Sequence, residues 1–256
     1  MLKPRNLAPA AALLDNMYAI ETDNVTKKFK DKTAVDNLDL KIKRGELFAL
    51  LGVNGAGKTT TIKMLTGLCE PTSGRTKILG LDINKNTIEI KSRLNVSPQE
   101  TAVAPNLTVL ENLDFLAGVY QIKNKSEKIA ALVKDFKLES VKNKKAKTLS
   151  GGWQRRLSIA LALINEPEIL FLDEPTLGLD VIARKELWHV IEKLKGEVTI
   201  ILTTQYMEEA EALSDRIGIM ADGRLVAVGT SKELIKKAKV KTFEDAFVKI
   251  ATGEEK

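Results

Sequence analysis

The chain has 256 residues, enough for one domain with a sizeable core and a subdomain. A single cysteine, Cys69, excludes an internal disulfide and a cysteine-rich zinc site, and favours the cytosol. No apolar stretch approaches the roughly 20 residues needed to cross a bilayer, so a membrane role would require a partner.

The chain is basic, with 40 lysine and arginine residues against 34 acidic ones and a formal charge of +6. Lysine-rich runs at 142–147 and 232–241 carry much of the excess. We interpret these runs as solvated helix faces. Contact with an acidic lipid surface or with nucleic acid is the alternative.

The first half of the chain predicts an antiparallel layer followed by a strand, a loop and a helix. Residues 1–16 are expected to be an N-terminal extension without a convincing cleavage site. Short strands are expected at 18–25 and 38–42, and a continuous apolar strand at 47–51. The apolar spacing of Ile62, Leu65 and Leu68 predicts a helix over 58–68, and another strand is expected at 77–81.

The segment between that apolar strand and that helix fits the pattern G-x-x-x-x-G-K-[ST] in the context that the motif requires. Bare backbone N–H groups and the positive end of the following helix favour phosphate binding. Lys58 is expected to reach the outer phosphates and the Thr59 hydroxyl to bind Mg²⁺. A chance glycine-rich turn is the alternative, which the flanking elements disfavour. The residues expected to contact the nucleotide here are Gly52, Asn54, Gly55, Ala56, Gly57, Lys58, Thr59 and Thr60.

The second half predicts a helical block inserted into an α/β core. A strand at 94–97 precedes expected helices at 109–120, 126–136 and 150–165. Strands at 169–172, 198–203 and 216–220 then alternate with helices at 181–194 and 207–214, which indicates a parallel sheet. A hairpin around Asp222-Gly223 and an amphipathic helix within 232–251 are expected to follow. We therefore predict a core at 17–98 and 165–230, a helical subdomain at 99–164 and a helical tail at 231–256.

Two carboxylates end the apolar strand at 169–172. Asp173 and Glu174 would lie at the carboxyl end of a parallel strand, where ligands bind. We assign Asp173 to Mg²⁺ and Glu174 to polarising or deprotonating a water molecule. A solvated pair of acids is the alternative, which the phosphate loop disfavours.

A second candidate anion site opens the helix at 150–165. Ser150 is a suitable N-cap, and Gly151 and Gly152 leave backbone N–H groups bare. Alone, the segment would be only a helix start. A second phosphate-binding tip is redundant within a monomer, but not if it serves the nucleotide of a neighbouring subunit.

Taken in order over residues 17–253, these features resemble the ATP-binding subunits of ABC transporters. The residues that carry the resemblance are the phosphate loop, Gln99 after a strand, Leu149-Ser150-Gly151-Gly152, Asp173-Glu174-Pro175 and Gly178-Leu179-Asp180. The Leu-Ser-Gly-Gly signature together with both nucleotide motifs is highly specific. Stretches 203–211 and 242–247 are similar to the branch that powers two-component exporters of the daunorubicin-resistance type.

The resemblance implies an α/β fold with a P-loop NTPase (RecA-like) core, an antiparallel β layer and an inserted α-helical subdomain, which is the ABC ATPase fold. It also implies a head-to-tail homodimer, or a pair with a related subunit, that encloses two ATP molecules with Mg²⁺. Each ATP would lie between the phosphate loop of one subunit and the signature helix of the other.

The resemblance also implies roles for individual residues. Phe29 would stack on adenine, for which a core phenylalanine is the alternative; base stacking contributes about 1–3 kcal/mol. Gln99 would bind Mg²⁺ and couple to the membrane partner, and Asp180 would cross the dimer interface. The γ-phosphate would be contacted in trans by Ser150, Gly151 and Gly152. The catalytic residues would be Lys58, Glu174 and Gln205.

Two positions depart from the family pattern. Trp153 stands where a glutamine commonly follows the two glycines, and we expect its side chain to face away from phosphate. Gln205 stands where most relatives carry a histidine that contacts the γ-phosphate, and the only histidine, His189, is not expected to replace it. A neutral hydrogen bond contributes about 0.5–1.5 kcal/mol against about 1.5–3 for a charged donor. We therefore expect a working ATPase whose rate is reduced by up to about tenfold.

The resemblance implies a cytoplasmic protein bound at the cell membrane through a separate integral-membrane permease, with ATP-driven dimer closure coupled to export. The alternative is a soluble ATPase of the same fold acting on nucleic acid or ribosomes. DNA-repair relatives need a coiled-coil or zinc insertion that this chain lacks, and ribosome-acting relatives usually carry two cassettes. No nucleic-acid partner is therefore expected. A small-molecule kinase would not explain the signature at 149–152.

Overall fold

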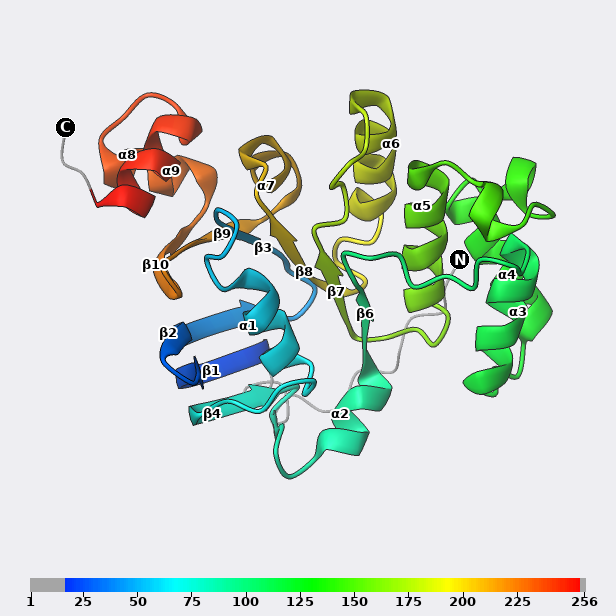
Figure 1. Ribbon diagram of the computed structural model, residues 1–256, viewed down its shortest axis with the longest axis horizontal. Coiled ribbons are helices and arrows are strands. Elements are labelled where there is room, and N and C mark those ends of the chain that lie inside the picture. Colours follow the sequence, from blue (N-terminus) through cyan, green and yellow to red (C-terminus); the bar gives the residue numbers. More distant parts are fainter. Residues whose placement is uncertain (1–16, 254–256) are drawn as a thin grey trace.

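A computed structural model describes residues 17–253; the predicted extension at 1–16 lies outside the described residues. Two sheets form the centre of the molecule, with helices on both sides (Figure 1). The strands are β1 (Tyr18–Phe29), β2 (Lys32–Lys43), β3 (Leu47–Leu51), β4 (Ser73–Ile78), β5 (Leu81–Asp82), β6 (Leu94–Ser97), β7 (Ile169–Asp173), β8 (Thr199–Thr204), β9 (Arg216–Ala221) and β10 (Arg224–Gly229). The helices are α1 (Lys58–Leu65), α2 (Thr87–Arg93), α3 (Val109–Val119), α4 (Lys125–Asp135), α5 (Gly151–Ala162), α6 (Val181–Glu192), α7 (Met207–Leu213), α8 (Ser231–Ala238) and α9 (Phe243–Thr252).

The larger sheet has six strands in the order β10-β9-β3-β8-β7-β6. Strands β9, β3, β8, β7 and β6 are parallel, and β10 pairs with β9 in an antiparallel hairpin. Every residue of β3, β7 and β8 is buried, as expected for parallel strands covered on both faces. Their carboxyl ends meet at one edge of the sheet, which is where ligands bind in such folds.

Successive side chains of the central strands enter different cores, because strand side chains alternate between the two faces. Leu170 and Leu172 of β7 pack into a cluster with the helical block, whereas Phe171 packs with Phe48 on the opposite face. The second cluster also includes residues of β1, β2 and α1. The smaller sheet, in the order β2-β1-β4-β5, therefore covers the face opposite the helical block.

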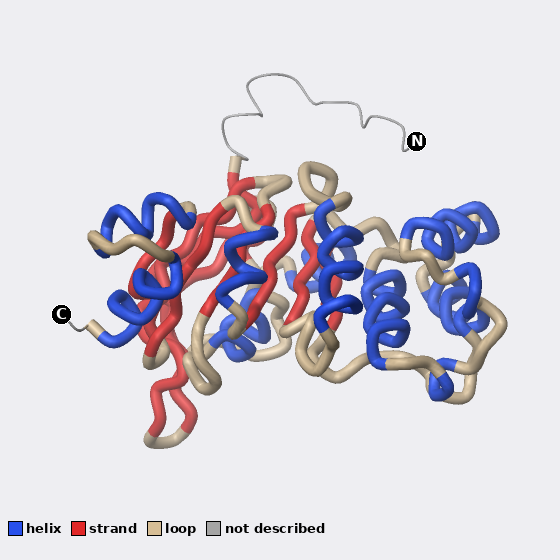
Figure 2. The backbone as a smooth tube through the Cα atoms, turned by 90° about the horizontal axis from the view of Figure 1, so that it is seen from above, coloured by secondary structure: helices blue, strands red, loops and turns tan. Residues whose placement is uncertain are grey.

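Helices α3, α4 and α5 lie together at one end of the molecule, away from the small sheet, and no strand enters this group (Figure 2). Thr108 and Glu111 form a capping box that starts α3, and Val109, Leu113 and Ala117 of this helix are buried against the same cluster as α5. The predicted division at 99 and 164 remains a prediction. No helix within residues 17–253 combines the length and the apolar character needed to cross a membrane.

Several predicted strand boundaries are wrong. β1 and β2 have 12 residues each and are longer than predicted, so Phe29 ends a strand. The strand predicted at 77–81 is interrupted, because Leu79 (φ 54°) and Gly80 (φ 82°) form a left-handed turn between β4 and β5. Isolated left-handed residues other than glycine give little signal in a sequence.

Helix predictions also need correction at three places. The helix expected within 232–251 is two helices, because Lys239 adopts φ 56° and Thr242 then starts α9 by accepting a hydrogen bond from the Asp245 backbone N–H. Helix α1 ends at Leu65 rather than residue 68, followed by Gly67 at φ 66°. Helix α2 was not predicted; Ile90 is its only buried side chain, so its sequence lacks a clear apolar face.

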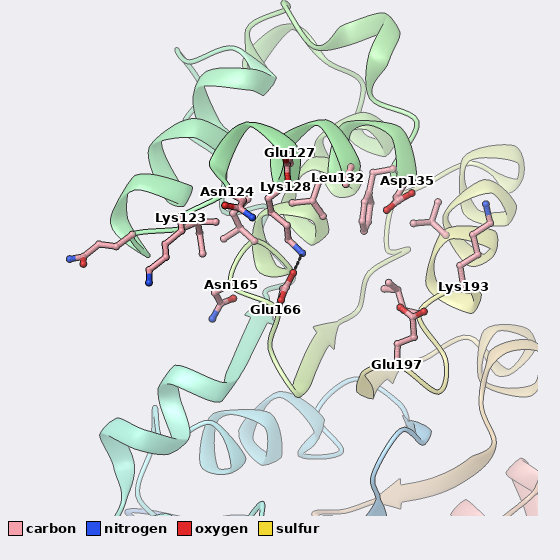
Figure 3. A pocket seen from close by; sticks show the side chains of 17 residues that line it. Lys123, Asn124, Glu127, Lys128, Leu132, Asp135, Asn165, Glu166, Lys193 and Glu197 are labelled. Carbon is pink, nitrogen blue, oxygen red and sulfur yellow. Dashed lines mark hydrogen bonds and ion pairs between the residues drawn. The ribbon is translucent and has the colours of Figure 1, made fainter. Parts of the chain in front are cut away.

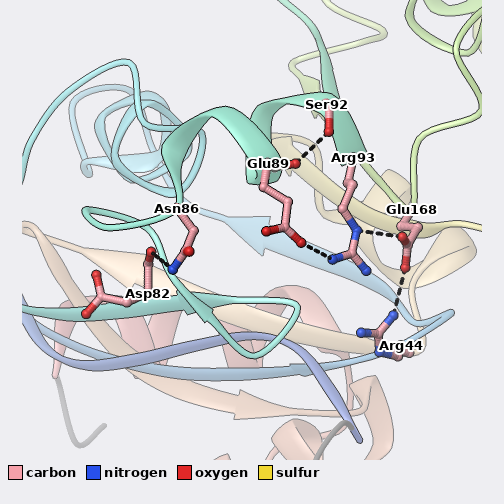
Figure 4. Close-up of polar contacts among 7 residues, drawn as sticks. All are labelled: Arg44, Asp82, Asn86, Glu89, Ser92, Arg93 and Glu168. Carbon is pink, nitrogen blue, oxygen red and sulfur yellow. Dashed lines mark hydrogen bonds and ion pairs between the residues drawn. The ribbon is translucent and has the colours of Figure 1, made fainter.

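A charged cluster at the amino end of β7 joins three segments of the chain (Figure 4). Glu168, just before β7, accepts hydrogen bonds from Arg44 Nη1 and Arg93 Nε, both at 2.8 Å. Burial opposes the charge of Glu168, but the hydrogen bonds from the two arginines outweigh it and lower the pKa of the carboxyl below its ordinary value. The cluster ties the turn between β2 and β3 and the end of α2 to the strand that leads to the site.

Candidate nucleotide site

The phosphate loop connects β3 to α1, as predicted, and two of its glycines are required sterically. A Cβ on Gly52 would lie 2.5 Å from the Met220 carbonyl oxygen. Gly57 adopts φ 102°, and a Cβ there would lie 2.6 Å from the Ala34 carbonyl oxygen. Gly57 is the N-cap position of α1 and has no side chain to cap it. The backbone N–H groups at this helix start therefore remain available for an anion.

Lys58 is buried at the base of this loop. Its Nζ donates to the carbonyl oxygens of Gly52 at 2.8 Å and Val53 at 3.2 Å. It also forms an ion pair with Glu174 Oε1 at 3.1 Å, and both side chains are about 5% exposed. The loop and the end of β7 are therefore joined by a buried charge pair, and a phosphate would compete with Glu174 for the Lys58 ammonium.

Thr59 and Asp173 lie together at the same edge of the sheet. The Thr59 hydroxyl is 3.3 Å from Asp173 Oδ1, which also accepts a hydrogen bond from Thr203 Oγ1 at 2.5 Å. Among the described residues no group of three or more His, Cys, Asp and Glu side chains is arranged to hold a metal ion. One hydroxyl and one carboxylate fit the Mg²⁺ of a P-loop site, where substrate phosphates and water supply the other ligands.

Glu174 follows Asp173 in a strained backbone conformation, with φ 48°. Its backbone N–H donates to the Thr203 side chain at 3.0 Å and carbonyl at 3.1 Å. Its Oε2 is buried and has no hydrogen-bond partner in the described structure. Non-glycine residues with positive φ concentrate at functional sites, and an unpaired buried carboxylate oxygen is suited to accept a hydrogen bond from a substrate water.

Gln99 lies in the exposed turn after β6, and its main chain is held by a residue that the sequence analysis did not identify. Arg155, a buried residue of α5, donates to the Pro98 carbonyl oxygen at 2.6 Å and to the Gln99 carbonyl oxygen. Burial lowers the pKa of Arg155, although the nearby charges of Asp173 and Glu209 oppose this. Arg155 thereby links the signature helix to the turn that carries Gln99.

The signature residues are placed away from the phosphate loop of the same chain. Ser150 is the N-cap of α5 but its side chain makes no capping hydrogen bond. Ser150 and Gly151 are exposed and Gly152 is partly buried. No hydrogen bond or ion pair in the described part of the chain joins them to Lys58 or Thr59. Their bare helix start therefore faces solvent, and their role toward a neighbouring nucleotide remains a prediction.

Phe29 and Asp180 are also exposed. Phe29 is 50% exposed, which excludes the alternative of a core phenylalanine, and its ring lies 4.9 Å from Lys27 Nζ. Asp180 accepts from the backbone N–H groups of Ile182 and Ala183 at 2.9 Å and so caps α6. Stacking on adenine and contact across a dimer interface remain predictions for these two residues.

Gln205 follows β8 in a turn closed by its neighbours. The Tyr206 backbone N–H donates to the Thr204 hydroxyl at 2.9 Å, and the Arg184 guanidinium lies 4.3 Å from the centre of the Tyr206 ring. His189 is mostly exposed, beside Glu192. Trp153 packs against the core cluster, and the centre of its ring lies 4.7 Å from Arg156 Cζ.

A hollow of about 910 Å³ is separate from the nucleotide site (Figure 3). It lies between α4 and α6 and is lined in part by Asn165, Lys193 and Glu197. An ion pair of 2.9 Å between Lys128 and Glu166 crosses it. The phosphate-loop residues do not line this hollow.

A Gly-rich loop after β3, a buried lysine and an Asp-Glu pair at the end of β7 define a P-loop NTPase. The profile of the family described as ABC transporter matches residues 35–177. A probable multidrug ABC transporter ATP-binding protein of Escherichia coli is 43% identical over 218 residues, covering 84% of this chain and 38% of that protein. The daunorubicin/doxorubicin resistance ATP-binding protein of Streptomyces peucetius is 40% identical, covering 84% of this chain and 66% of that protein. The chain belongs to the ABC transporter family.

Solved structures agree with this assignment. An ATP-binding subunit of an ABC transporter superposes with a TM-score of 0.81 at 26% identity, covering 91% of this chain and 99% of that one. A dimeric post-hydrolysis ATP-binding cassette with bound ADP and phosphate superposes with a TM-score of 0.74 at 28% identity, covering 82% and 98%. These matches confirm the predicted fold, and the bound nucleotide of the second supports ATP as the ligand of the family.

Proposed function

We propose that this chain is the ATP-hydrolysing subunit of an exporter, in which two subunits close head to tail on two ATP molecules and a separate membrane permease carries the cargo. The observation that carries the proposal is the split site. Lys58, Thr59, Asp173 and Glu174 gather at one edge of the sheet, whereas the signature helix start at Ser150 is exposed and unbonded to them. Neither half encloses a triphosphate alone.

Within one half-site, four side chains have distinct tasks. Thr59 and Asp173 would hold Mg²⁺, which neutralises charge that develops on the phosphates. Lys58 exchanges its contact with Glu174 for phosphate oxygens. The released Glu174, with its Oε2 already unpaired, orients the attacking water and accepts its proton.

The second half-site comes from the partner copy. The bare N–H groups at Ser150, Gly151 and Gly152 donate to the γ-phosphate, as expected for an anion at a helix N-terminus. Gln205 of the first subunit adds a neutral hydrogen-bond donor. Closure therefore excludes water and completes the charge stabilisation only when two chains meet.

Coupling to a permease is proposed through the turn at Gln99. Arg155 fixes this turn to the signature helix, so a displacement of the turn by a membrane partner would shift that helix as well. The relatives named for multidrug and daunorubicin resistance support export as the direction of transport. The chain spans only part of those relatives, so the cargo and the partner are part of the proposal.

The test begins with the Glu174→Gln variant, which should bind ATP without hydrolysing it. We expect it to form dimers on addition of ATP, measured by size-exclusion chromatography with light scattering, whereas Lys58→Ala should stay monomeric. Co-purification of the wild-type chain from membranes with a permease, and stimulation of its ATPase activity by cargo, would support export. Stimulation by RNA or DNA instead would support the nucleic-acid alternative and contradict the transporter proposal.

A further inference from the structure

Helix α7 places a carboxylate in the core that the proposed mechanism does not use. Glu209 is 0% exposed, and its Oε1 accepts a hydrogen bond from the Trp188 indole N–H at 3.0 Å. Its Oε2 and the Thr176 hydroxyl are both buried without a hydrogen-bond partner in the described structure. A buried acid with an unpaired oxygen costs stability, so a purely structural role would be better served by an apolar residue.

The surroundings of Glu209 disfavour the charged form of its carboxyl. Burial raises the pKa of Glu209 above its ordinary value, and the charge of Glu174 adds to this. The hydroxyls of Thr204 and Thr176 and the indole of Trp188 oppose the shift.

The hydrogen bond from Trp188 to Glu209 joins two functional segments. Trp188 belongs to α6, which begins after Asp180, and Glu209 belongs to α7, which follows Gln205. Thr204 comes directly before Gln205, and its hydroxyl accepts the Tyr206 backbone N–H at 2.9 Å. That hydrogen bond closes a turn around Gln205 just before α7, so a contact that ties α7 to α6 also restricts where Gln205 points.

A second contact joins the same two helices. Arg184, one turn before Trp188 on α6, stacks on the Tyr206 ring at 4.3 Å and lies 4.0 Å from Glu208. The Gln205 turn is therefore held against α6 from two sides, by the Tyr206 ring and by Glu209. A movement of α6 would be transmitted to the turn, because both contacts are short and partly buried.

We propose that Glu209 is a positioning residue for ATP hydrolysis: through its hydrogen bond to Trp188 it holds the Gln205 turn on α6, so that Gln205 reaches the γ-phosphate only when the Asp180 end of α6 is in its dimer position. This inference rests on the proposed ATPase function and on the role given there to Gln205. It assigns to Glu209 no contact with nucleotide.

The test compares three substitutions with one control. Glu209→Ala and Trp188→Phe each remove the hydrogen bond, and loss of one such bond should lower kcat about tenfold. KM for ATP should change less than about threefold, because the phosphate loop is untouched. Glu209→Gln retains an amide oxygen that can accept the indole N–H and should keep most of the activity. Glu192→Gln, on the exposed face of α6, is the control and should behave as wild type.

A double-mutant cycle separates positioning from general destabilisation. If Glu209 acts through Gln205, adding Trp188→Phe or Glu209→Ala to Gln205→Ala should slow hydrolysis no further than Gln205→Ala alone. Rates are normalised to nucleotide-binding stoichiometry, and Trp188→Phe carries the test if Glu209→Ala does not fold. Three results would each overturn this inference but leave the proposed function standing. They are additive losses of rate in the double variants, a Glu209→Gln variant as slow as Glu209→Ala, and a rise in KM with unchanged kcat. A wild type that does not hydrolyse ATP would overturn the proposed function and this inference with it.

Discussion

The buried pair between Lys58 and Glu174 allows a quantitative prediction for Glu174→Gln. The substitution preserves shape but removes the charge that lies 3.1 Å from the Lys58 ammonium. At an effective dielectric constant of about 20 that attraction amounts to about 5 kcal/mol before desolvation is counted. Breaking a buried pair costs about 3–5 kcal/mol. Lys58 keeps its hydrogen bonds to the carbonyl oxygens of Gly52 and Val53. We therefore expect the substitution to lower the free energy of unfolding by about 3 kcal/mol, at the lower end of that range.

The predicted loss is visible in thermal unfolding. In a protein of this size about 3 kcal/mol lowers Tm by about 6 °C or more. Nucleotide phosphates would replace the charge partner that Lys58 has lost, so MgATP should raise the Tm of Glu174→Gln more than that of wild type. Turnover, measured by phosphate release, should fall about 10²- to 10⁴-fold, as for loss of a general base.

The matched control is Glu166→Gln, which removes the partner of Lys128 in a pair whose glutamate is 54% exposed. A pair of this kind contributes about 1 kcal/mol or less, so Tm should hardly change and turnover should remain. If Glu174→Gln without nucleotide melts like wild type, the buried pair does not exist in solution. If it hydrolyses ATP within threefold of wild type, Glu174 is not the base.

Three further predictions concern individual residues of the site and of the charged cluster. Gly52→Ala should weaken ATP binding about tenfold or more in a fluorescence titration, because overpacking costs about 1–3 kcal/mol, whereas Gly118→Ala, where a Cβ meets open space, should bind normally. Gln205→His should raise turnover by up to about tenfold, and loss of turnover would contradict the role given to Gln205. Because the arginines lower the pKa of Glu168, the charged carboxylate stabilises the folded protein. This contribution is complete above the unfolded pKa of about 4.3 and is lost as pH falls through the folded pKa. Urea unfolding should therefore show Glu168→Gln less stable than wild type at pH 7, with the gap closing toward pH 3; a constant gap would contradict the cluster.

The parallel core and the phosphate-binding half of the site could be predicted from the sequence because their signals are local. The buried strands are continuous apolar runs, and the glycine-rich loop directly precedes its own helix. Asp173 was placed at the correct edge because the carboxyl ends of parallel strands coincide. The comparisons confirm the fold class and family that the motifs indicated.

The rest depended on contacts between residues far apart in the sequence. Arg155 is one cation among many in the chain, and nothing in the neighbouring sequence indicates that it donates a hydrogen bond to the Gln99 carbonyl oxygen. The breaks at Leu79 and Lys239 arise from left-handed backbone that tertiary packing imposes. Glu209 did give a signal, because it lies four residues before the buried Leu213 on the same helix face, and an acid on an apolar face is unusual.

The requirement for two copies is tested most directly by ATPase activity as a function of protein concentration. Specific activity of the wild-type chain at saturating MgATP should rise with concentration toward a plateau and fall toward zero on dilution below the dimer dissociation constant, because each chain supplies only half of the site. Mixing Ser150→Arg with Lys58→Ala, each inactive alone, should restore part of the activity through one intact composite site. Constant specific activity down to nanomolar protein, where light scattering shows only monomer, would contradict the account.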